Sequence, residues 1–64
     1  LTARDEDLLA RVVALAFGQR RKMLRNSLER LVSVDQLAAA GISPLARAEE
    51  LTVADYVRLA NSLP

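Results

Sequence analysis

A complete helix signal lies in residues 32–42, which read VSVDQLAAAGI. Ser33 and Gln36 are spaced as a capping box, in which each side chain bonds to the other residue's backbone N–H, and Val32 and Leu37 are spaced as its hydrophobic staple. Gly41 can adopt the left-handed conformation that ends many helices, and Ile42 can then fold back onto Leu37 in a Schellman motif. The stretch therefore predicts a short helix with both of its ends defined.

The same kind of start recurs near the C-terminus. Thr52 is expected to cap a last helix, Asp55 completes the box, and Leu51 and Tyr56 form a second staple. The helical spacing predicts that its buried face is lined by Val53, Tyr56, Val57 and Ala60.

The N-terminal half predicts two further helices. Thr2 is expected to cap the first one, with Asp5 as its acidic partner, and Phe17-Gly18 to end it. Apolar residues recur on one face of this helix at Leu9, Val12, Val13 and Ala16, and the face is widened by Leu8 and Leu15. The second helix is expected over about residues 20–30, with a buried stripe of Leu24, Leu28 and Leu31.

These signals predict an all-α fold, a compact bundle of four to five short helices in which residues 1–64 form a single domain. A further short turn is expected at Ser43-Pro44, with proline at the first helical position. Because so short a chain buries little surface, its stability must come from efficient helix packing or from a neighbouring domain. The chain begins with Leu1, so we expect it to be part of a longer protein.

Composition narrows the possible functions. The 64 residues include no cysteine and no histidine, which excludes disulfides and the usual zinc ligands and general bases. We therefore expect no catalytic site and no metal site within these residues. No apolar run approaches the roughly 18 residues of a membrane span, and no signal peptide opens the chain, so we expect no membrane partner and a cytoplasmic location.

One cluster of charges indicates a partner. Residues 20–30 contain five cations and one acid, a net charge of +4 in a chain whose total is +1. Three cations, Arg20, Arg21 and Lys22, are expected in the first turn of a helix, where the macrodipole is positive and each is unfavourable by about 0.3–1 kcal/mol. A bound phosphate would reverse that penalty, because cations and free N–H groups would converge on it.

Helical geometry assigns a direction to each cation. Lys22 and Arg25 are expected on the outer face with Glu29, and Arg21 at its border. Arg20 falls on the inner side, where it could pair with a carboxylate or cover the edge of the core. The helix dipole accounts for Arg30, which lies near the helix end. The alternative to phosphate binding is a solvated basic face, partly paired through Arg25 and Glu29.

Two longer stretches carry a resemblance. Residues 17–28, FGQRRKMLRNSL, and residues 40–51, AGISPLARAEEL, are similar to blocks in the C-terminal domain of bacterial small-subunit ribosomal RNA adenine dimethyltransferases, and residues 56–61, YVRLAN, resemble that family's closing helix. The resemblance covers residues from about 10 to 63. Arg20, Arg21, Lys22 and Arg25 match the family's basic motif, whereas Met23 stands where many members have threonine.

The resemblance implies a two-domain protein whose Rossmann-like N-terminal domain binds S-adenosylmethionine and methylates two adjacent adenines. The helical domain would pack beside it and help to seat the protein on small-subunit ribosomal RNA. The family's glycine-rich cofactor loop and its Asn-x-Pro-Tyr motif do not occur here, so no cofactor and no catalytic residue is expected in these residues. In this picture Arg21, Lys22, Arg25 and Arg20 contact RNA phosphates.

Some residues and alternatives remain open at this point. Arg47 and Glu49 are interpreted as an ion pair that locks a short turn, and Asn26 as a local cap or packing residue. Residues 36–43 have the outline of a DNA-binding helix-turn-helix, but Glu49 and Glu50 would repel DNA phosphates in its second helix, so no DNA is expected. The wide apolar face of the first helix could also belong to a protein-interaction module, or could dock the N-terminal domain.

Overall fold

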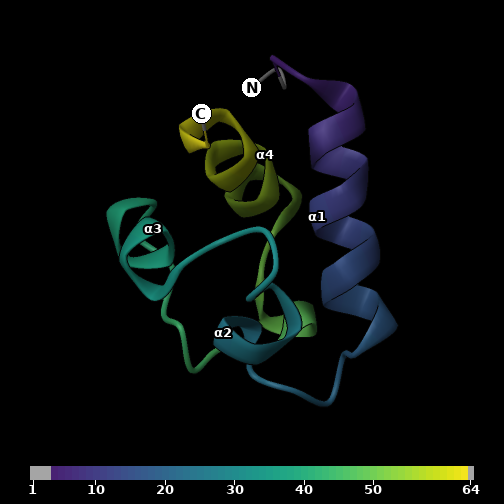
Figure 1. Ribbon diagram of the computed structural model, residues 1–64, viewed down its shortest axis with the longest axis vertical. Coiled ribbons are helices and arrows are strands. Elements are labelled where there is room, and N and C mark those ends of the chain that lie inside the picture. The colour runs from purple at the N-terminus through teal and green to yellow at the C-terminus, as the bar shows by residue number, and fades with distance from the viewer. Residues whose placement is uncertain (1–3, 64) are drawn as a thin grey trace.

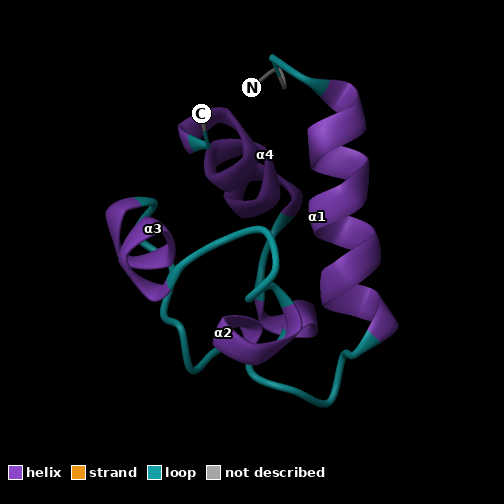
Figure 2. Ribbon diagram, in the orientation of Figure 1, coloured by secondary structure: helices purple, strands orange, loops and turns teal. Residues whose placement is uncertain are grey.

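The computed structural model describes residues 4–63, which form four α-helices and one 3₁₀ turn and contain no β-strand (Figures 1 and 2). In chain order the elements are α1 (Glu6–Gly18), α2 (Leu24–Ser27), α3 (Val34–Ala39), the 3₁₀ turn η1 (Ala48–Glu50) and α4 (Val53–Ser62). The all-α fold of four to five short helices is therefore confirmed for these residues.

The longest helix, α1, forms one side of the molecule, and the other elements pack against it or against each other (Figure 1). α4 and η1 both contact α1, α2 lies against its C-terminal end, and α3 packs on α4. A single apolar core lies between them. Its largest fully buried side chains are Leu24, Leu28, Leu37, Leu59, Val12 and Val32.

The predicted ends of α3 are confirmed. Ser33 Oγ accepts from the N–H of Gln36 at 3.1 Å, and Gln36 Oε1 accepts from the N–H of Ser33 at 2.8 Å. Gly41 has a φ of 76°, and the N–H of Ile42 donates to the Leu37 carbonyl at 2.9 Å, as a Schellman motif requires. Val32, Leu37 and Ile42 all belong to the core.

The second capping box is confirmed as well. Thr52 Oγ1 accepts from the N–H of Asp55 at 3.1 Å, and Asp55 Oδ2 accepts from the N–H of Thr52 at 2.9 Å. The prediction that Val53 belongs to the buried face is wrong, because this residue is 80% exposed. It occupies the first position of α4, ahead of the turns that contact α1 and α3, and Leu59 lies inward together with Tyr56, Val57 and Ala60.

The start of α1 also differs from the prediction. Asp5 is not the acidic partner in a capping box but the cap itself, since its Oδ1 accepts from the N–H of Leu8 at 3.0 Å. Glu6 and Asp7 then occupy the positive end of the helix dipole. Thr2 lies outside the described residues. The apolar face is as predicted, with Val12 and Ala16 buried and Leu9, Val13 and Leu15 packed against the core.

The helix predicted over residues 20–30 is the main error, because α2 spans only four residues. The loop that follows α3 meets its first turn: the N–H of Leu24 donates to the Ala46 carbonyl at 2.7 Å, and that of Arg25 to the Pro44 carbonyl at 3.1 Å. Met23 pairs with Arg47 in an isolated antiparallel bridge. The carbonyls of Pro44 and Ala46, about 20 residues further along the chain, thus take the N–H groups that a longer helix would use, and α2 begins only at Leu24.

Two smaller expectations for this part of the chain are confirmed. The short turn expected at Ser43-Pro44 is confirmed, and it does not continue into a helix: the N–H of Ala46 donates to the Ser43 carbonyl at 3.1 Å, and Ser43 Oγ accepts from the N–H of Leu45 at 3.3 Å. The buried stripe survives the shortening of α2: Leu24 and Leu28 are fully buried, and Leu31 packs against the core.

Two side chains of α4 join the elements around it. The Tyr56 hydroxyl donates to the Ala48 carbonyl of η1 at 2.7 Å within the core. Arg58 Nε donates to the Ala40 carbonyl at the end of α3 at 2.8 Å, and its Nη2 forms an ion pair with Asp55 at 2.7 Å. α4 therefore satisfies polar backbone groups on both of its neighbours.

Leu24→Ala should lower the free energy of unfolding by about 2–5 kcal/mol, because it empties a fully buried leucine site at the junction of α2 with the core. Urea denaturation followed by circular dichroism measures this loss. The exposed Leu45, which is 59% accessible, provides a matched Leu→Ala control that should change stability little. Equal losses in the two variants would contradict the assigned core.

Tyr56→Phe should lower the free energy of unfolding by about 0.5–1.5 kcal/mol, because the Ala48 carbonyl loses its shorter hydrogen bond and keeps only the one from the N–H of Leu51 at 3.4 Å. Burial, and secondarily the charge of Asp55, raises the pKa of Tyr56 above its ordinary value of 10.0. Above pH 10 the unfolded tyrosine therefore ionises while the folded one keeps its proton, and stability falls as the pH rises.

Thermal unfolding between pH 8 and pH 11 checks this, with Tyr56→Phe as the variant that lacks the titrating group. The tyrosine-dependent part of the decline should be absent in that variant. The same decline in both proteins would show that Tyr56 does not cause it.

Candidate functional site

The basic segment lies in the connection between α1 and α2. Arg20, Arg21 and Lys22 follow the last turn of α1 and are exposed, in a turn where the N–H of Lys22 donates to the Gln19 carbonyl at 2.9 Å. α1 and α2 hold the two ends of this turn against the core. The cations therefore project from a connection that both helices anchor.

The expected first-turn placement of these cations is wrong. Arg20, Arg21 and Lys22 precede α2, so they do not oppose its dipole. The N–H groups of Leu24 and Arg25 are already bonded to Ala46 and Pro44, and those of Asn26 and Ser27 to the Met23 carbonyl. The backbone amides of this helix end consequently have no hydrogen left to offer a phosphate, and any anion must be held by side chains.

The expected ion pairs are also absent from the described residues. Arg20 is exposed rather than turned inward, and neither Arg25 with Glu29 nor Arg47 with Glu49 forms a salt bridge. Within residues 4–63 the salt bridge is the one between Arg58 and Asp55. No carboxylate of this part of the chain therefore neutralises Arg20, Arg21, Lys22 or Arg25.

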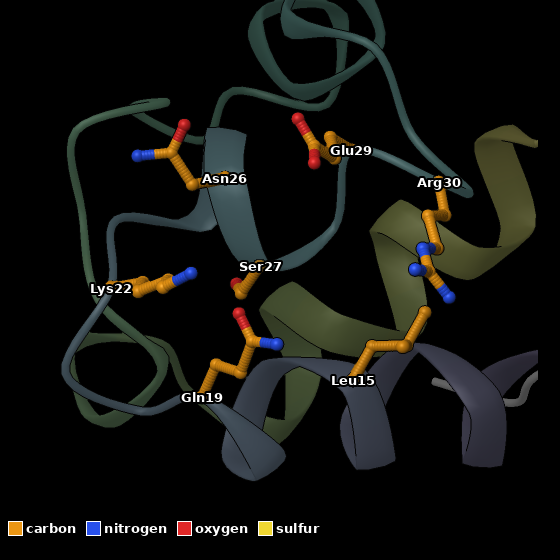
Figure 3. Close-up of a pocket in the computed structure, with 7 residues that line it drawn as sticks. All are labelled: Leu15, Gln19, Lys22, Asn26, Ser27, Glu29 and Arg30. Atoms are coloured by element: carbon orange, nitrogen blue, oxygen red, sulfur yellow. The ribbon is translucent and has the colours of Figure 1, made fainter.

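Three adjoining hollows run along this side of the molecule. The largest, a cleft of about 420 Å³ between the end of α1 and α2, is lined by Leu15, Gln19, Lys22, Asn26, Ser27, Glu29 and Arg30 (Figure 3). A second hollow of about 350 Å³ is lined by residues 17–22 and shares Gln19 and Lys22 with the cleft. A third, also about 350 Å³, is lined by Arg11, Ala14, Leu15, Arg30 and Leu31.

Shared lining residues make these hollows one continuous surface, which we call the basic track. Its cations are Arg11, Arg20, Arg21, Lys22 and Arg30, and Glu29 is the acid among its lining residues. The predicted residue Arg25 is exposed but lines none of the three hollows.

Two cations of the track were not predicted as site residues. The prediction that a helix dipole accounts for Arg30 is wrong, because α2 ends at Ser27 and Arg30 lies in the turns that follow. Arg11 belongs to α1, far from the cluster in sequence, and lines the same hollow as Arg30. A spacing of four places Arg11 and Leu15 on one face of α1, and Gln19 follows directly after the end of this helix. This spacing is the only signal in the sequence that could have indicated the placement of Arg11.

The cleft also contains groups that carry no charge. Asn26, expected to cap or pack, is instead exposed and lines the cleft, as does Gln19. Ser27 is only 7% exposed, and its hydroxyl has no hydrogen-bond partner. Lys22 and Arg30 lie on opposite sides, with Ser27 between them and the Gln19 carboxamide pointing toward it (Figure 3).

Within residues 4–63, no group of three or more His, Cys, Asp or Glu side chains is arranged to hold a metal ion. Across the same residues, no helical segment combines the length and the apolar character that crossing a bilayer requires.

Ser27→Ala should raise the free energy of unfolding by about 1 kcal/mol, because it removes a buried hydroxyl that has no hydrogen bond and places a stronger helix former in α2. Chemical denaturation measures the change. Ser33→Ala is the matched control and should have the opposite sign, a loss of about 1 kcal/mol, since Ser33 caps α3. A destabilised Ser27→Ala protein would show that the hydroxyl is bonded in the folded chain.

Comparison with known proteins gives a consistent result. The family described as "Ribosomal RNA adenine dimethylase" matches residues 1–64. Among curated relatives, proteins named "Ribosomal RNA small subunit methyltransferase A" are 58% identical over 94% of this chain in Aromatoleum aromaticum, 56% over 97% in Chromobacterium violaceum and 60% over 86% in Pasteurella multocida. The matched regions are 23%, 24% and 19% of those relatives, so the chain spans about a quarter of their length or less.

Proposed function

Because the chain belongs to the ribosomal RNA adenine dimethylase family, we propose that it is the helical RNA-positioning domain of an S-adenosylmethionine-dependent methyltransferase. The substrate of the whole enzyme is small-subunit ribosomal RNA, in which it dimethylates two adjacent adenines. Cofactor binding and methyl transfer belong to a Rossmann-like N-terminal domain, and these residues form the C-terminal domain that packs beside it. In the complex with RNA, the helical domain supplies binding energy and orients the RNA relative to the N-terminal domain.

The basic track is the observation that carries this proposal. Five cations line three adjoining hollows that contain one carboxylate, and no described acid pairs with the predicted cations. Unpaired cations on one surface repel each other, whereas a polyanion laid along them turns this repulsion into attraction and releases its counterions. An RNA backbone provides such a regular series of negative charges.

We assign the phosphate contacts to Arg20, Arg21, Lys22 and Arg25, with Arg30 and Arg11 extending the line. Arg20, Arg21, Lys22 and Arg30 lie in turns, whereas Arg11 belongs to α1 and Arg25 to α2. Their charged side chains, and not free amides of a helix N-terminus, would hold the phosphates. Flexible, exposed cations of this kind bind phosphates in any sequence context. Base selection is therefore left to the rest of the enzyme.

The arrangement of the elements argues against a DNA-binding helix-turn-helix. α3 ends at Ala39 and is followed by the Ser43–Ala46 turn instead of a second helix that could enter a major groove. The next helical residues are the 3₁₀ turn η1, which contains Glu49 and Glu50. Those acids would face a DNA backbone unfavourably.

Changing Arg21, Lys22 and Arg25 together to glutamine should weaken RNA binding for all sequences. The slope of log K against log salt should flatten by about 0.7–0.9 for each phosphate contact that is lost. Fluorescence anisotropy with a short single-stranded RNA at several salt concentrations measures both quantities. An unchanged slope in this variant would contradict the assignment.

The control for this experiment removes charge elsewhere. Arg4 and Arg47 are exposed and line no hollow of the basic track. Changing both to glutamine should alter the slope much less per charge removed than the triple variant does. Equal effects per charge would mean that net charge alone attracts the RNA.

A further inference from the structure

We propose that the cleft between α1 and α2 seats one ribose–phosphate unit of an RNA strand and recognises the 2′-hydroxyl of that ribose. This inference rests on the RNA binding proposed above and makes it chemically specific: the cleft distinguishes RNA from DNA, whereas the rest of the basic track does not.

The mixture of groups in the cleft is the first argument. Lys22 and Arg30 stand on opposite sides, where they can hold a phosphate, but phosphate binding alone does not account for the other polar groups (Figure 3). Gln19, Asn26 and Ser27 both donate and accept hydrogen bonds, and Glu29 accepts only. A sugar hydroxyl both donates and accepts hydrogen bonds, so it can pair with these side chains.

Ser27 provides the second, independent argument. Its hydroxyl lies at the floor of the cleft, 93% of the residue is buried, and the oxygen has no partner. A buried polar atom without a hydrogen bond is unfavourable for folding. A ligand hydroxyl that reaches it would supply the missing bond, so the unfavourable group in the free protein becomes a favourable one in the complex.

Access to Ser27 depends on Gln19. The Gln19 carboxamide points toward Ser27 in Figure 3, yet no hydrogen bond joins it to the described part of the chain, and the residue is exposed. Rotation of this free side chain opens the floor of the cleft to a sugar. Gln19 can then bond to the same ribose, because its amide donates and accepts.

The size of the cleft and the absence of aromatic side chains from its lining agree with a sugar rather than a base. A cleft of about 420 Å³ falls at the small end of the range for ligand pockets. None of its lining residues is aromatic, so it has no surface on which a base would stack. The 2′-hydroxyl is the group by which proteins tell RNA from DNA at a given site, and its recognition is independent of sequence.

The test compares three short oligonucleotides with the same uracil bases: RNA, the 2′-deoxy form and the 2′-O-methyl form. Binding to the 64-residue chain is measured by fluorescence anisotropy at several salt concentrations. The RNA should bind about three- to tenfold more tightly than either modified strand, which corresponds to one or two net hydrogen bonds. The salt slope should be the same for all three, because their phosphates are the same.

Two variants locate the effect in the cleft. The first variant is Ser27→Ala, and the second is the double variant Gln19→Leu, Asn26→Leu. In each, RNA and the modified strands should bind with nearly equal affinity, and the salt slope should not change. Ser62→Ala is the matched control: Ser62 is exposed at the end of α4, donates to the Leu59 carbonyl and lines no part of the basic track, and its variant should keep the full preference.

The possible outcomes separate this inference from the proposed function. Equal binding of the three strands with a steep salt slope would overturn ribose recognition and leave phosphate binding standing. A preference that survives in both cleft variants would also overturn it, because the 2′-hydroxyl would then be read elsewhere. Salt-independent or undetectable binding of every strand would contradict the proposed function itself.

Discussion

The short contact between the start of α2 and the loop after α3 determines the shape of this side of the molecule. The Pro44 and Ala46 carbonyls accept from the N–H groups of Arg25 and Leu24, and Met23 pairs with Arg47. Once these backbone groups are bonded across the molecule, the helix cannot extend toward Arg20 without breaking them. α2 remains four residues long, and the segment between it and α1 becomes a turn.

That turn changes the electrostatics of the basic cluster. In a longer helix, Arg20, Arg21 and Lys22 would oppose the dipole, and a phosphate would be attracted to free amides at the helix end. In the observed fold the amides are occupied, and the cations are spread over two hollows that meet at Lys22. Attraction for a polyanion therefore comes from side chains distributed along a surface instead of from one focused backbone site.

Local and tertiary effects are combined differently in the C-terminal half. The capping boxes of α3 and α4 use partners three residues apart, so they form as soon as each helix begins. Tyr56 and Arg58 then connect these elements by bonding to the carbonyls of Ala48 and Ala40. This half is thus supported by polar contacts as well as by the core, and it presents to α2 the loop on which the geometry of the cleft depends.

The sequence by itself determined the all-α class, both capping boxes, the left-handed Gly41 and most of the core, because these features depend on side chains three to five residues apart. It also carried the resemblance to the rRNA adenine dimethylase family, with which the comparisons agree. Only the tertiary structure decided the length of α2, the exposure of Val53, the placement of Arg11 and Arg30 along one hollow, and the burial of Ser27. Each of these depends on which distant backbone carbonyl or helix face comes to lie alongside, and periodicity within one helix contains no information about that neighbour.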